Sequence, residues 1–437
     1  MSKNRKIGIS VALLGLAVMF AAVMIYQSRK VTVLEVGIFA GSNWDVANAN
    51  SYVIIDKAIE KFEATHENVK VHYYSGIRKE SYSEWLSRQV LLGKEPDVFM
   101  VLGEDFNQFA EIGIMKDLEQ LMENDPDFDQ NCYYATTLQA GQYGGRQYAL
   151  PYETVPILMF VNKSLLNREG IAVPDNDWTW EDLYRISQKV TKDRDGDGLL
   201  DQFGTYNYNW MAAVYSNGAK LFDENGTESY FNDERVTEAV RFAKEITELN
   251  RTQKVTKDDF DSGNVAFMPL PFTEYRIYKT YPYKIKKYTK FQWDCITLPA
   301  GKDGGNTSDI NTLLMGISNH TNQEQLAWEF LKLLTYDEEI QMDLFRYSQG
   351  VSVLKQVTCS RETEEILQED MEKNEKFIDN KLVSDVIENG VVTPKFPKYA
   401  DAVIMADNEI NRMIEDDDNI DNSMRILQRQ IGKYLRR

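Results

Sequence analysis

Cysteine and histidine are scarce in this sequence of 437 residues, with only three of each. Cys132, Cys295 and Cys359 lie far apart, which excludes a disulfide framework and the ligand spacing of a zinc finger. One disulfide bond and three free thiols both fit this spacing. The three histidines are scattered as well, so the sequence provides no histidine metal site and no convincing Ser-His-Asp triad.

Positive charge is also in deficit. The chain has 49 Lys and Arg residues against 68 Asp and Glu residues, a formal net charge of −19. Such a surface repels phosphate backbones, which argues against nucleic acid as a partner. Aromatic residues are abundant instead, at 12% of the chain. Flat rings with polar edges suit the faces of sugars, and they also serve any hydrophobic core.

One long uncharged stretch runs from Ile7 to Tyr26, after three positive charges and before Arg29 and Lys30. About twenty residues are enough to cross a membrane as a helix. A cleaved secretory signal has a similar form, so residues 1–30 predict either a membrane anchor or a signal peptide. Both place the chain on the extracytoplasmic face of the plasma membrane, anchored by the N-terminal helix or secreted. No cysteine precedes Cys132, so a lipid-modified cysteine cannot be the anchor.

The chain after this segment is long enough for two or more lobes. Its first part alternates strand and helix, which predicts a parallel, right-handed wound sheet of the α/β class. The expected elements are a strand at 31–39, a helix at 51–66, a strand at 69–74, a helix at 83–92 and a strand at 97–102.

Ligands of open α/β sheets bind beyond the carboxyl ends of the strands. Two polar segments occupy that place, the loop Ser42-Asn43-Trp44-Asp45 and the pair Glu104-Asp105. Further along, Gly144-Gly145 predicts a hairpin turn. Thr179 is a plausible N-cap for a helix, with Asp182 three residues later. The chain shows no internal repeat and no low-complexity linker, so we expect it to cross between lobes several times.

The segment from Asp193 to Asp201 has the spacing of a calcium loop. Asp193, Asp195, Asp197 and Asp201 occupy positions one, three, five and nine, and Leu199 at position seven offers its carbonyl oxygen. Position twelve is not Glu, so a bidentate ligand has to come from elsewhere. A structural calcium site and a solvated Asp/Gly turn remain the two readings, and nothing catalytic accompanies either.

Aromatic stretches around Trp210 and Phe272, with Glu274 nearby, would suit sugar binding, although ordinary core packing is the alternative. Paired carboxylates such as Glu104 and Glu153 could serve a glycosidase. With 68 acidic residues, however, such a pair arises by chance, and we expect no enzyme.

The chain from about Val31 to its end resembles the extracellular solute-binding proteins of family 1, the sugar-binding components of ATP-driven importers. Several segments carry the resemblance in order. They are FEATHENVKVHY at 62–73, GKEPDVFMV at 93–101, GGRQYALPYE at 144–153, LMFVNKSLL at 158–166, WTWEDLYRISQKVT at 178–191, NGAKLFDENG at 217–226, FDSGNVAFM at 260–268 and AWEFLKLLTYDEEIQ at 327–341.

The resemblance implies a periplasmic-binding-protein fold, with two α/β lobes, a hinge and a ligand cleft. Lobe one would hold 31–145 plus 285–340, and lobe two 146–284 plus 341–437. It implies a monomer that captures a small sugar or oligosaccharide and delivers it to the permease of an ABC importer. A membrane-anchored sensor or adhesion module is the alternative. The expected ligand contacts are Ser42, Asn43, Trp44, Asp45, Glu104, Asp105, Tyr152, Glu153, Trp210, Phe272, Glu274 and Asn311.

Overall fold

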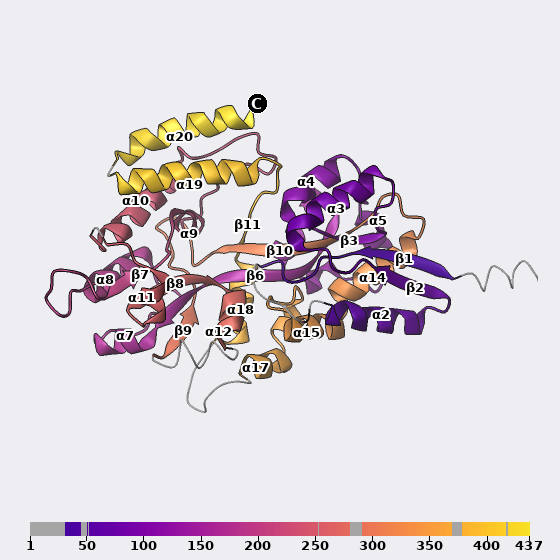
Figure 1. Ribbon diagram of the computed structural model, residues 1–437, viewed down its shortest axis with the longest axis horizontal. Helices are drawn as coiled ribbons and strands as arrows, with labels where there is room; N and C mark the ends of the chain where they lie inside the picture. Colours follow the sequence, from indigo (N-terminus) through magenta and orange to yellow (C-terminus); the bar gives the residue numbers. More distant parts are fainter. Residues whose placement is uncertain are drawn as a thin grey trace, which may run out of the picture.

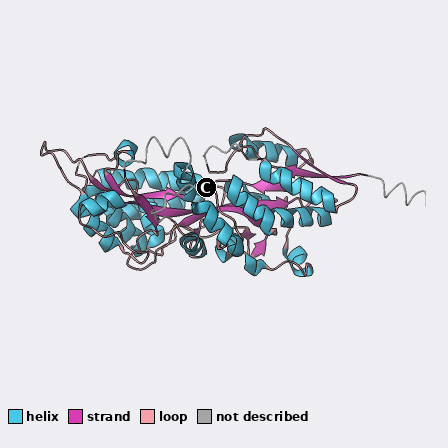
Figure 2. Ribbon diagram, turned by 90° about the horizontal axis from the view of Figure 1, so that it is seen from below, coloured by secondary structure: helices cyan, strands magenta, loops and turns pink. Residues whose placement is uncertain are grey.

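A computed structural model describes residues 31–44, 50, 52–251, 253–279, 291–368, 378–416 and 418–437. The predicted anchor at 1–30 and the predicted ligand residue Asp45 lie outside these residues. Across the described part of the chain, we find no helix with the length and apolar character that crossing a membrane requires. The molecule is elongated and built from strands flanked by helices on both sides (Figures 1 and 2).

The N-terminal sheet confirms the predicted wound topology. Strands β1 (Thr32–Gly37), β2 (Val69–Tyr73) and β3 (Val98–Val101) are parallel, with β1 between the other two. Helices α2 (Val53–Thr65), α3 (Lys79–Leu91) and α4 (Gly103–Glu111) follow them in turn. The carboxyl ends of these strands therefore point toward the middle of the molecule, where Figure 1 places β10 and β6.

Two long antiparallel strands join the two ends of the molecule. Strand β10 (Asp309–Ile317) pairs with β3 on one edge and with β6 (Ala149–Asn162) on the other. Beyond Pro156, β6 pairs with β8 (Val265–Pro271) and β9 (Trp293–Ile296), and β7 (Phe203–Thr205) lies parallel to β8. The short strand β11 (Val391–Val392) pairs with the start of β10. One sheet thus runs through the described part of the molecule.

The predicted hairpin is present as β4 (Gln142–Tyr143) and β5 (Arg146–Gln147). Gly144 and Gly145 form its turn, with φ of 57° and 78°, which glycine adopts without a steric cost. Strand β6 is buried along almost its entire length, Ala149–Asn162.

Helices cover both faces of this sheet, and the predicted cap of α8 is confirmed. Thr179 and Asp182 form a reciprocal capping box there. The remaining helices are α5 (Glu119–Asn124), the short 3₁₀ helix η1 (Gln130–Cys132), α6 (Ala135–Gln139), α7 (Lys163–Arg168), α8 (Trp180–Val190), α9 (Trp210–Ser216), α10 (Glu234–Glu248), α11 (Lys257–Asp261), α12 (Phe272–Lys279), α14 (Glu324–Tyr336), α15 (Glu338–Tyr347), α16 (Lys355–Thr358), α17 (Arg361–Gln368), α18 (Asn380–Glu388), α19 (Tyr399–Glu415) and α20 (Ile420–Leu435).

The core consists of three hydrophobic clusters. The first surrounds β1–β3 and includes Phe99 and Trp328, and the second lies at the opposite end around α8–α10, with Trp210 among its members. The third lies between them and includes Phe160 and Phe272. All three cysteines are free thiols in the structure, which decides between the two readings of their spacing.

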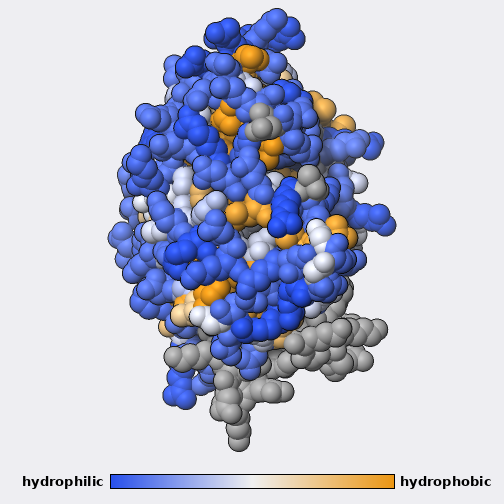
Figure 3. Space-filling model, turned by 90° about the vertical axis from the view of Figure 1, so that its left-hand side faces the viewer, coloured by the Kyte–Doolittle hydropathy of each residue, from blue (hydrophilic) through white to orange (hydrophobic). Residues whose placement is uncertain are grey.

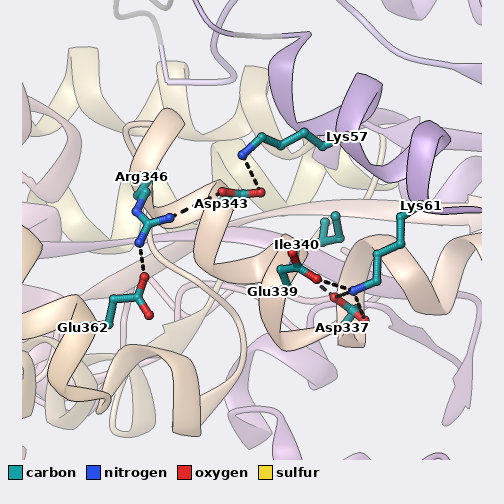
Figure 4. A network of polar contacts seen from close by, with 8 residues as sticks. All are labelled: Lys57, Lys61, Asp337, Glu339, Ile340, Asp343, Arg346 and Glu362. Carbon is teal, nitrogen blue, oxygen red and sulfur yellow. Dashed lines mark hydrogen bonds and ion pairs between the residues drawn. The ribbon is translucent and has the colours of Figure 1, made fainter.

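Helix α15 packs against α2 at the N-terminal end of the molecule. Lys57 pairs with Asp343 and Lys61 with Asp337, each at 2.8 Å, and Arg346 extends the network toward α17 (Figure 4). Exposed ion pairs contribute little, so packing matters more: α15 places Ile340 and Leu344 in the first cluster. The segment after residue 340 therefore continues the N-terminal core.

The surface at the end formed by α7, α8 and α10 is mostly hydrophilic, with hydrophobic residues in small separate groups (Figure 3). This distribution agrees with the net charge of −19. Small groups of apolar residues of this kind are normal on a protein surface.

Candidate functional site

The described residues enclose a pocket of about 380 Å³ beside β11, near the middle of the molecule (Figure 1). Three segments that are far apart in sequence form it. Helix α4 and the β4–β5 hairpin contribute one wall, the stretch from α9 to residue 230 another, and the stretch from β11 to the start of α19 the third. A pocket of this size, shared between the two ends of the molecule, can hold a small organic ligand.

Tyrosines dominate the side of the pocket that belongs to the second cluster. The hydroxyl groups of Tyr215 and Tyr399 lie 3.4 Å apart, and Tyr230 lines the same wall. Burial raises the pKa of Tyr215 and Tyr399, and the nearby Asp309 carboxylate adds to both shifts. Burial also raises the pKa of Asp309 to about 6. The tyrosines therefore keep their protons at neutral pH and can donate hydrogen bonds.

The loop before α10 is held against the segment that follows β11. Gly226 has a φ of 66°, and a Cβ there would lie 2.3 Å from the Phe396 ring, so only glycine allows this approach. The Asp223 carboxylate accepts the Glu228 N–H at 2.7 Å and the Thr227 hydroxyl at 2.7 Å, which fixes the turn. The loop is thus a rigid wall of the pocket.

Two contacts link this loop and the β11 segment to α4. The Asn107 amide donates to the Glu224 carbonyl oxygen at 3.4 Å, which connects the two ends of the molecule across the pocket. The Lys395 ammonium lies 5.7 Å from the centroid of the Phe106 ring. Burial lowers the pKa of Lys395 to about 8.

The predicted ligand loop after β1 lies elsewhere, beside the crossing strands. Ser42 accepts the Trp44 N–H at 3.1 Å, and the Asn43 carbonyl accepts the Lys79 ammonium at 2.5 Å. Trp44 packs against both the first and the third clusters. The structure therefore anchors this loop on the core and places the Trp44 indole next to Glu153.

Glu153 is a buried carboxylate on β6. It accepts hydrogen bonds from the Ser348 hydroxyl and from the Gly350 N–H at 2.7 Å. Burial raises its pKa, because desolvation outweighs these hydrogen bonds and the adjacent Trp44 indole. Protein groups therefore surround this carboxylate.

A half-buried arginine lies near Glu153. Arg276 on α12 donates to the Phe345 carbonyl at 2.8 Å and to the Ser348 carbonyl at 3.4 Å. Its guanidinium carbon lies 4.8 Å from the Phe345 ring centroid, and burial lowers its pKa to about 10. Phe272 belongs to the same region, with its ring centroid 6.4 Å from that of Phe345.

Two more predicted ligand residues belong to α4. Glu104 is exposed at its N-terminal end, whereas Asp105 is buried, accepts the Ser83 hydroxyl at 2.7 Å and has its pKa raised by burial. Tyr152 is buried in the first cluster. These positions do not converge on one point.

The last three predicted ligand residues are also separate. Trp210 is buried in the second cluster and donates to Asp407 at 2.9 Å. Glu274 lies 3.8 Å from the Lys257 ammonium, and Asn311 is exposed on β10. The structure thus brings Trp44, Glu153 and Phe272 into one region, while the residues lining the pocket come from other segments. The run Pro394–Tyr399, with aromatic residues and lysines directly before a helix, is the signal in the sequence that could have indicated the pocket.

The predicted calcium loop folds into a compact turn. The carboxylates of Asp193, Asp195 and Asp197 lie within 4.8 Å of one another and could hold a metal ion. Asp201 instead accepts the Arg194 N–H at 2.7 Å, and Leu199 is exposed. Hydrogen bonds from the Gly198 and Gly196 N–H groups lower the pKa of Asp193, so it is ionised at neutral pH.

Comparison with known protein families gives one match over most of the chain. Residues 47–340 match the model of the bacterial extracellular solute-binding proteins. Two curated relatives, from Brucella abortus and Brucella suis, are named as binding proteins and are 22% identical over 262 residues. That match covers 57% of this chain and only 60% of each relative.

Solved structures show the same fold. An ABC substrate-binding protein of Listeria monocytogenes, solved in complex with cycloalternan, is 19% identical with a TM-score of 0.67 and covers 93% of this chain and 99% of its own. The cyclic alpha-maltosyl-1,6-maltose binding protein of Arthrobacter globiformis is 15% identical, with a TM-score of 0.74 and coverages of 93% and 99%. A sugar-binding protein of Xanthomonas citri is 14% identical, with a TM-score of 0.74 and coverages of 92% and 97%. The expected periplasmic-binding-protein fold is confirmed.

Proposed function

Because the chain belongs to the bacterial extracellular solute-binding proteins, which are not enzymes, we propose that it captures an oligosaccharide and delivers it to the permease of an ABC importer. The observation that carries this proposal is the pocket beside β11, where tyrosines and amides from both ends of the molecule converge. Structural neighbours named as binding cycloalternan and a cyclic maltosyl-maltose support the ligand class.

The lining suits a sugar chemically. The rings of Tyr230 and Tyr399, which are both half-buried in the pocket lining, can cover the C–H faces of pyranose rings, and their hydroxyl oxygens can accept hydrogen bonds from sugar hydroxyls. Asn107 contributes an amide from the opposite wall. A ligand that touched both walls would hold the two ends of the molecule together, as closure around a ligand requires.

We propose that the protein has two lobes, which are joined where β6, β10 and β11 cross the middle of the molecule. Lobe one holds 31–145 and the stretch up to residue 340, and lobe two the stretch after 146 with the C-terminal helices. The packing of α15 on α2 supports adding residues 341–357 to lobe one. The predicted residues Trp44, Glu153 and Asn311 lie at the strand crossing, and we propose that they border the same cleft.

Calorimetric titration of oligosaccharides into the full chain tests the function. We expect saturable binding that Tyr230→Ala weakens by about fivefold, since a stacked aromatic ring contributes on the order of 1 kcal/mol. Tyr74→Ala is the matched control, because Tyr74 is exposed and lies outside the pocket lining. Binding of a peptide or polyamine, with no binding of any saccharide, would overturn the proposal.

We further propose that the Asp193–Asp201 loop binds calcium as a structural ion. Three clustered carboxylates repel one another unless a cation neutralises them. Added calcium should raise the melting temperature of the chelator-treated protein, and Asp195→Ala should abolish the rise. Asp177→Ala, in another exposed turn, should leave it intact. An unchanged melting temperature would mean that the loop is a turn without a metal.

Residues 1–30 are proposed to hold the protein at the outer face of the membrane. The uncharged stretch after three positive charges supports this. Fractionation of cells producing the full chain should place it with the membranes, and N-terminal sequencing should still find the first residues. A shortened chain in the medium would indicate a cleaved signal instead.

A further inference from the structure

Partly buried lysines in this protein have oxygen partners. Lys116 lies 2.8 Å from Glu324, and Lys332 lies 2.6 Å from Asp125. Where no carboxylate is at hand, backbone carbonyls substitute, as for Lys398, which donates to Leu435 at 3.0 Å. Among the described residues, all the other half-buried lysines except one also have such a partner.

Lys395 is the exception. It has no carboxylate or carbonyl partner among the described residues, and only the Phe106 ring lies near its ammonium group. Burial alone lowers its pKa, to about 8, so no neighbouring acid offsets the desolvation, yet the side chain remains mostly protonated at pH 7. The protein therefore holds a cation in the pocket wall without compensating its charge.

The other charged residues lining the pocket do not form an ion pair with Lys395. The Asp223 carboxylate already accepts hydrogen bonds from Thr227 and Glu228 within its own turn. Glu224 and Lys220 are both exposed. Among the described residues, these charged groups leave Lys395 unpaired, so a ligand in the pocket can supply its acceptor.

We propose that the solute is an acidic oligosaccharide, whose carboxylate or sulfate group pairs with Lys395. This inference rests on the proposed function, because it names the ligand class of the same pocket. Lys395 is half-buried, and withdrawing a cation from water is unfavourable unless it is paired, whereas an ion pair formed inside the closed pocket is strengthened by exclusion of water. A protein with a net charge of −19 repels anionic ligands in general, so a cation placed in the pocket has a selective effect.

The test is calorimetric titration of the full chain with matched pairs of ligands. The acidic probes are oligogalacturonides, hyaluronan oligosaccharides and chondroitin sulfate disaccharides. The neutral probes are maltooligosaccharides and the methyl esters of the same oligogalacturonides, which keep the shape and remove the charge. We expect at least one acidic probe to bind, at least tenfold more tightly than its neutral counterpart, with weaker binding at high salt.

Variants then assign the effect to Lys395. Lys395→Gln should weaken binding of the acidic probe by about ten- to a hundredfold, as expected for the loss of a charged hydrogen bond, and should weaken binding of neutral probes much less. Lys395→Arg should retain most of the affinity. Lys189→Gln makes the same charge change at an exposed position on α8 and should have no effect. The melting temperature of ligand-free Lys395→Gln should equal or exceed that of the wild type, which rules out loss of folding.

Three results would overturn the inference. Binding of neutral saccharides alone would refute it and leave the proposed function standing. If Lys395→Gln bound an acidic probe as tightly as the wild type does, the inference would also be refuted, because the acidic group of the probe would then not pair with Lys395. If no saccharide of either kind bound, both the inference and the proposed function would be wrong.

Discussion

Two regions of this molecule bury charge, and they treat it differently. At the strand crossing, Glu153 accepts hydrogen bonds from the Ser348 hydroxyl and the Gly350 N–H. In the pocket wall, the Lys395 ammonium group contacts the Phe106 ring and has no carboxylate or carbonyl partner among the described residues.

This difference in hydrogen-bonding partners distinguishes a charge with a structural role from a charge with a role in ligand binding. A buried charge with its hydrogen bonds supplied by the protein fixes the path of the chain, here where the segment after α15 meets β6. A half-buried charge without such partners, such as Lys395, lowers stability and is expected where a ligand supplies the missing partner. Substitutions in the two regions should therefore change stability in opposite directions.

The largest effect is expected at Glu153. Glu153→Ala should lower the free energy of unfolding by about 3 kcal/mol, because it leaves the Ser348 hydroxyl and the Gly350 N–H buried without an acceptor and opens a cavity. Denaturant unfolding followed by fluorescence measures the change.

Glu153→Gln is the control for this loss. It keeps an oxygen acceptor while removing the charge, so it should remain within about 1 kcal/mol of the wild type. If Glu153→Ala were as stable as the wild type, the hydrogen bonds at the strand crossing would have no structural role, and the comparison would fail.

Substitution of Lys395 is expected to change the free energy of unfolding in the opposite direction, by raising it. Its folded-state pKa of about 8 lies below the usual 10.5, so the charged form disfavours folding at neutral pH. Lys395→Met should therefore raise the free energy of unfolding at pH 7 by about 1 to 2 kcal/mol. The stability of the wild type should rise relative to this variant between pH 8 and 10.5, where the folded protein releases the proton first.

Lys398→Met provides a neighbouring control. Lys398 donates to the last carbonyls of α20, so its loss should lower stability by about 0.5 to 1 kcal/mol at pH 7. If both variants were destabilised, Lys395 would have a structural partner and the contrast between the two regions would disappear.

A smaller effect is expected at Asp309, beneath Tyr215 and Tyr399. Burial raises its pKa to about 6, above the usual 3.8, so its contribution to stability is present below pH 3.8 and is lost as the pH rises through 6. Asp309→Asn should raise the free energy of unfolding at pH 7 by about 1 kcal/mol. Melting curves at pH 4 and pH 7 measure it, and an equal effect at both values would exclude titration of this group.

The sequence allowed much of the fold to be predicted. Hydrophobic periodicity located β1–β3 with their helices, and the Gly144-Gly145 turn and the Thr179 cap were correct because each depends on neighbouring residues only. The family resemblance was correct as well. Local signals of this kind are sufficient for elements within one part of the chain.

The long-range features were harder to predict. The continuous strand β6 contains two prolines and depends on β10, β8 and β9, which lie more than a hundred residues away. The pocket brings Asn107, Tyr230 and Lys395 together, and nothing in their local sequences relates them. The absence of a partner for Lys395 becomes visible only when the surrounding segments are in place.

The central claim is that the pocket beside β11 binds the solute. A crystal structure of the full chain with a saccharide that binds in calorimetry tests it most directly. The account predicts a sugar ring against Tyr215, Tyr230 or Tyr399, with an acidic group within hydrogen-bond distance of the Lys395 ammonium. A saccharide bound away from this pocket, with Lys395 still unpaired, would contradict it.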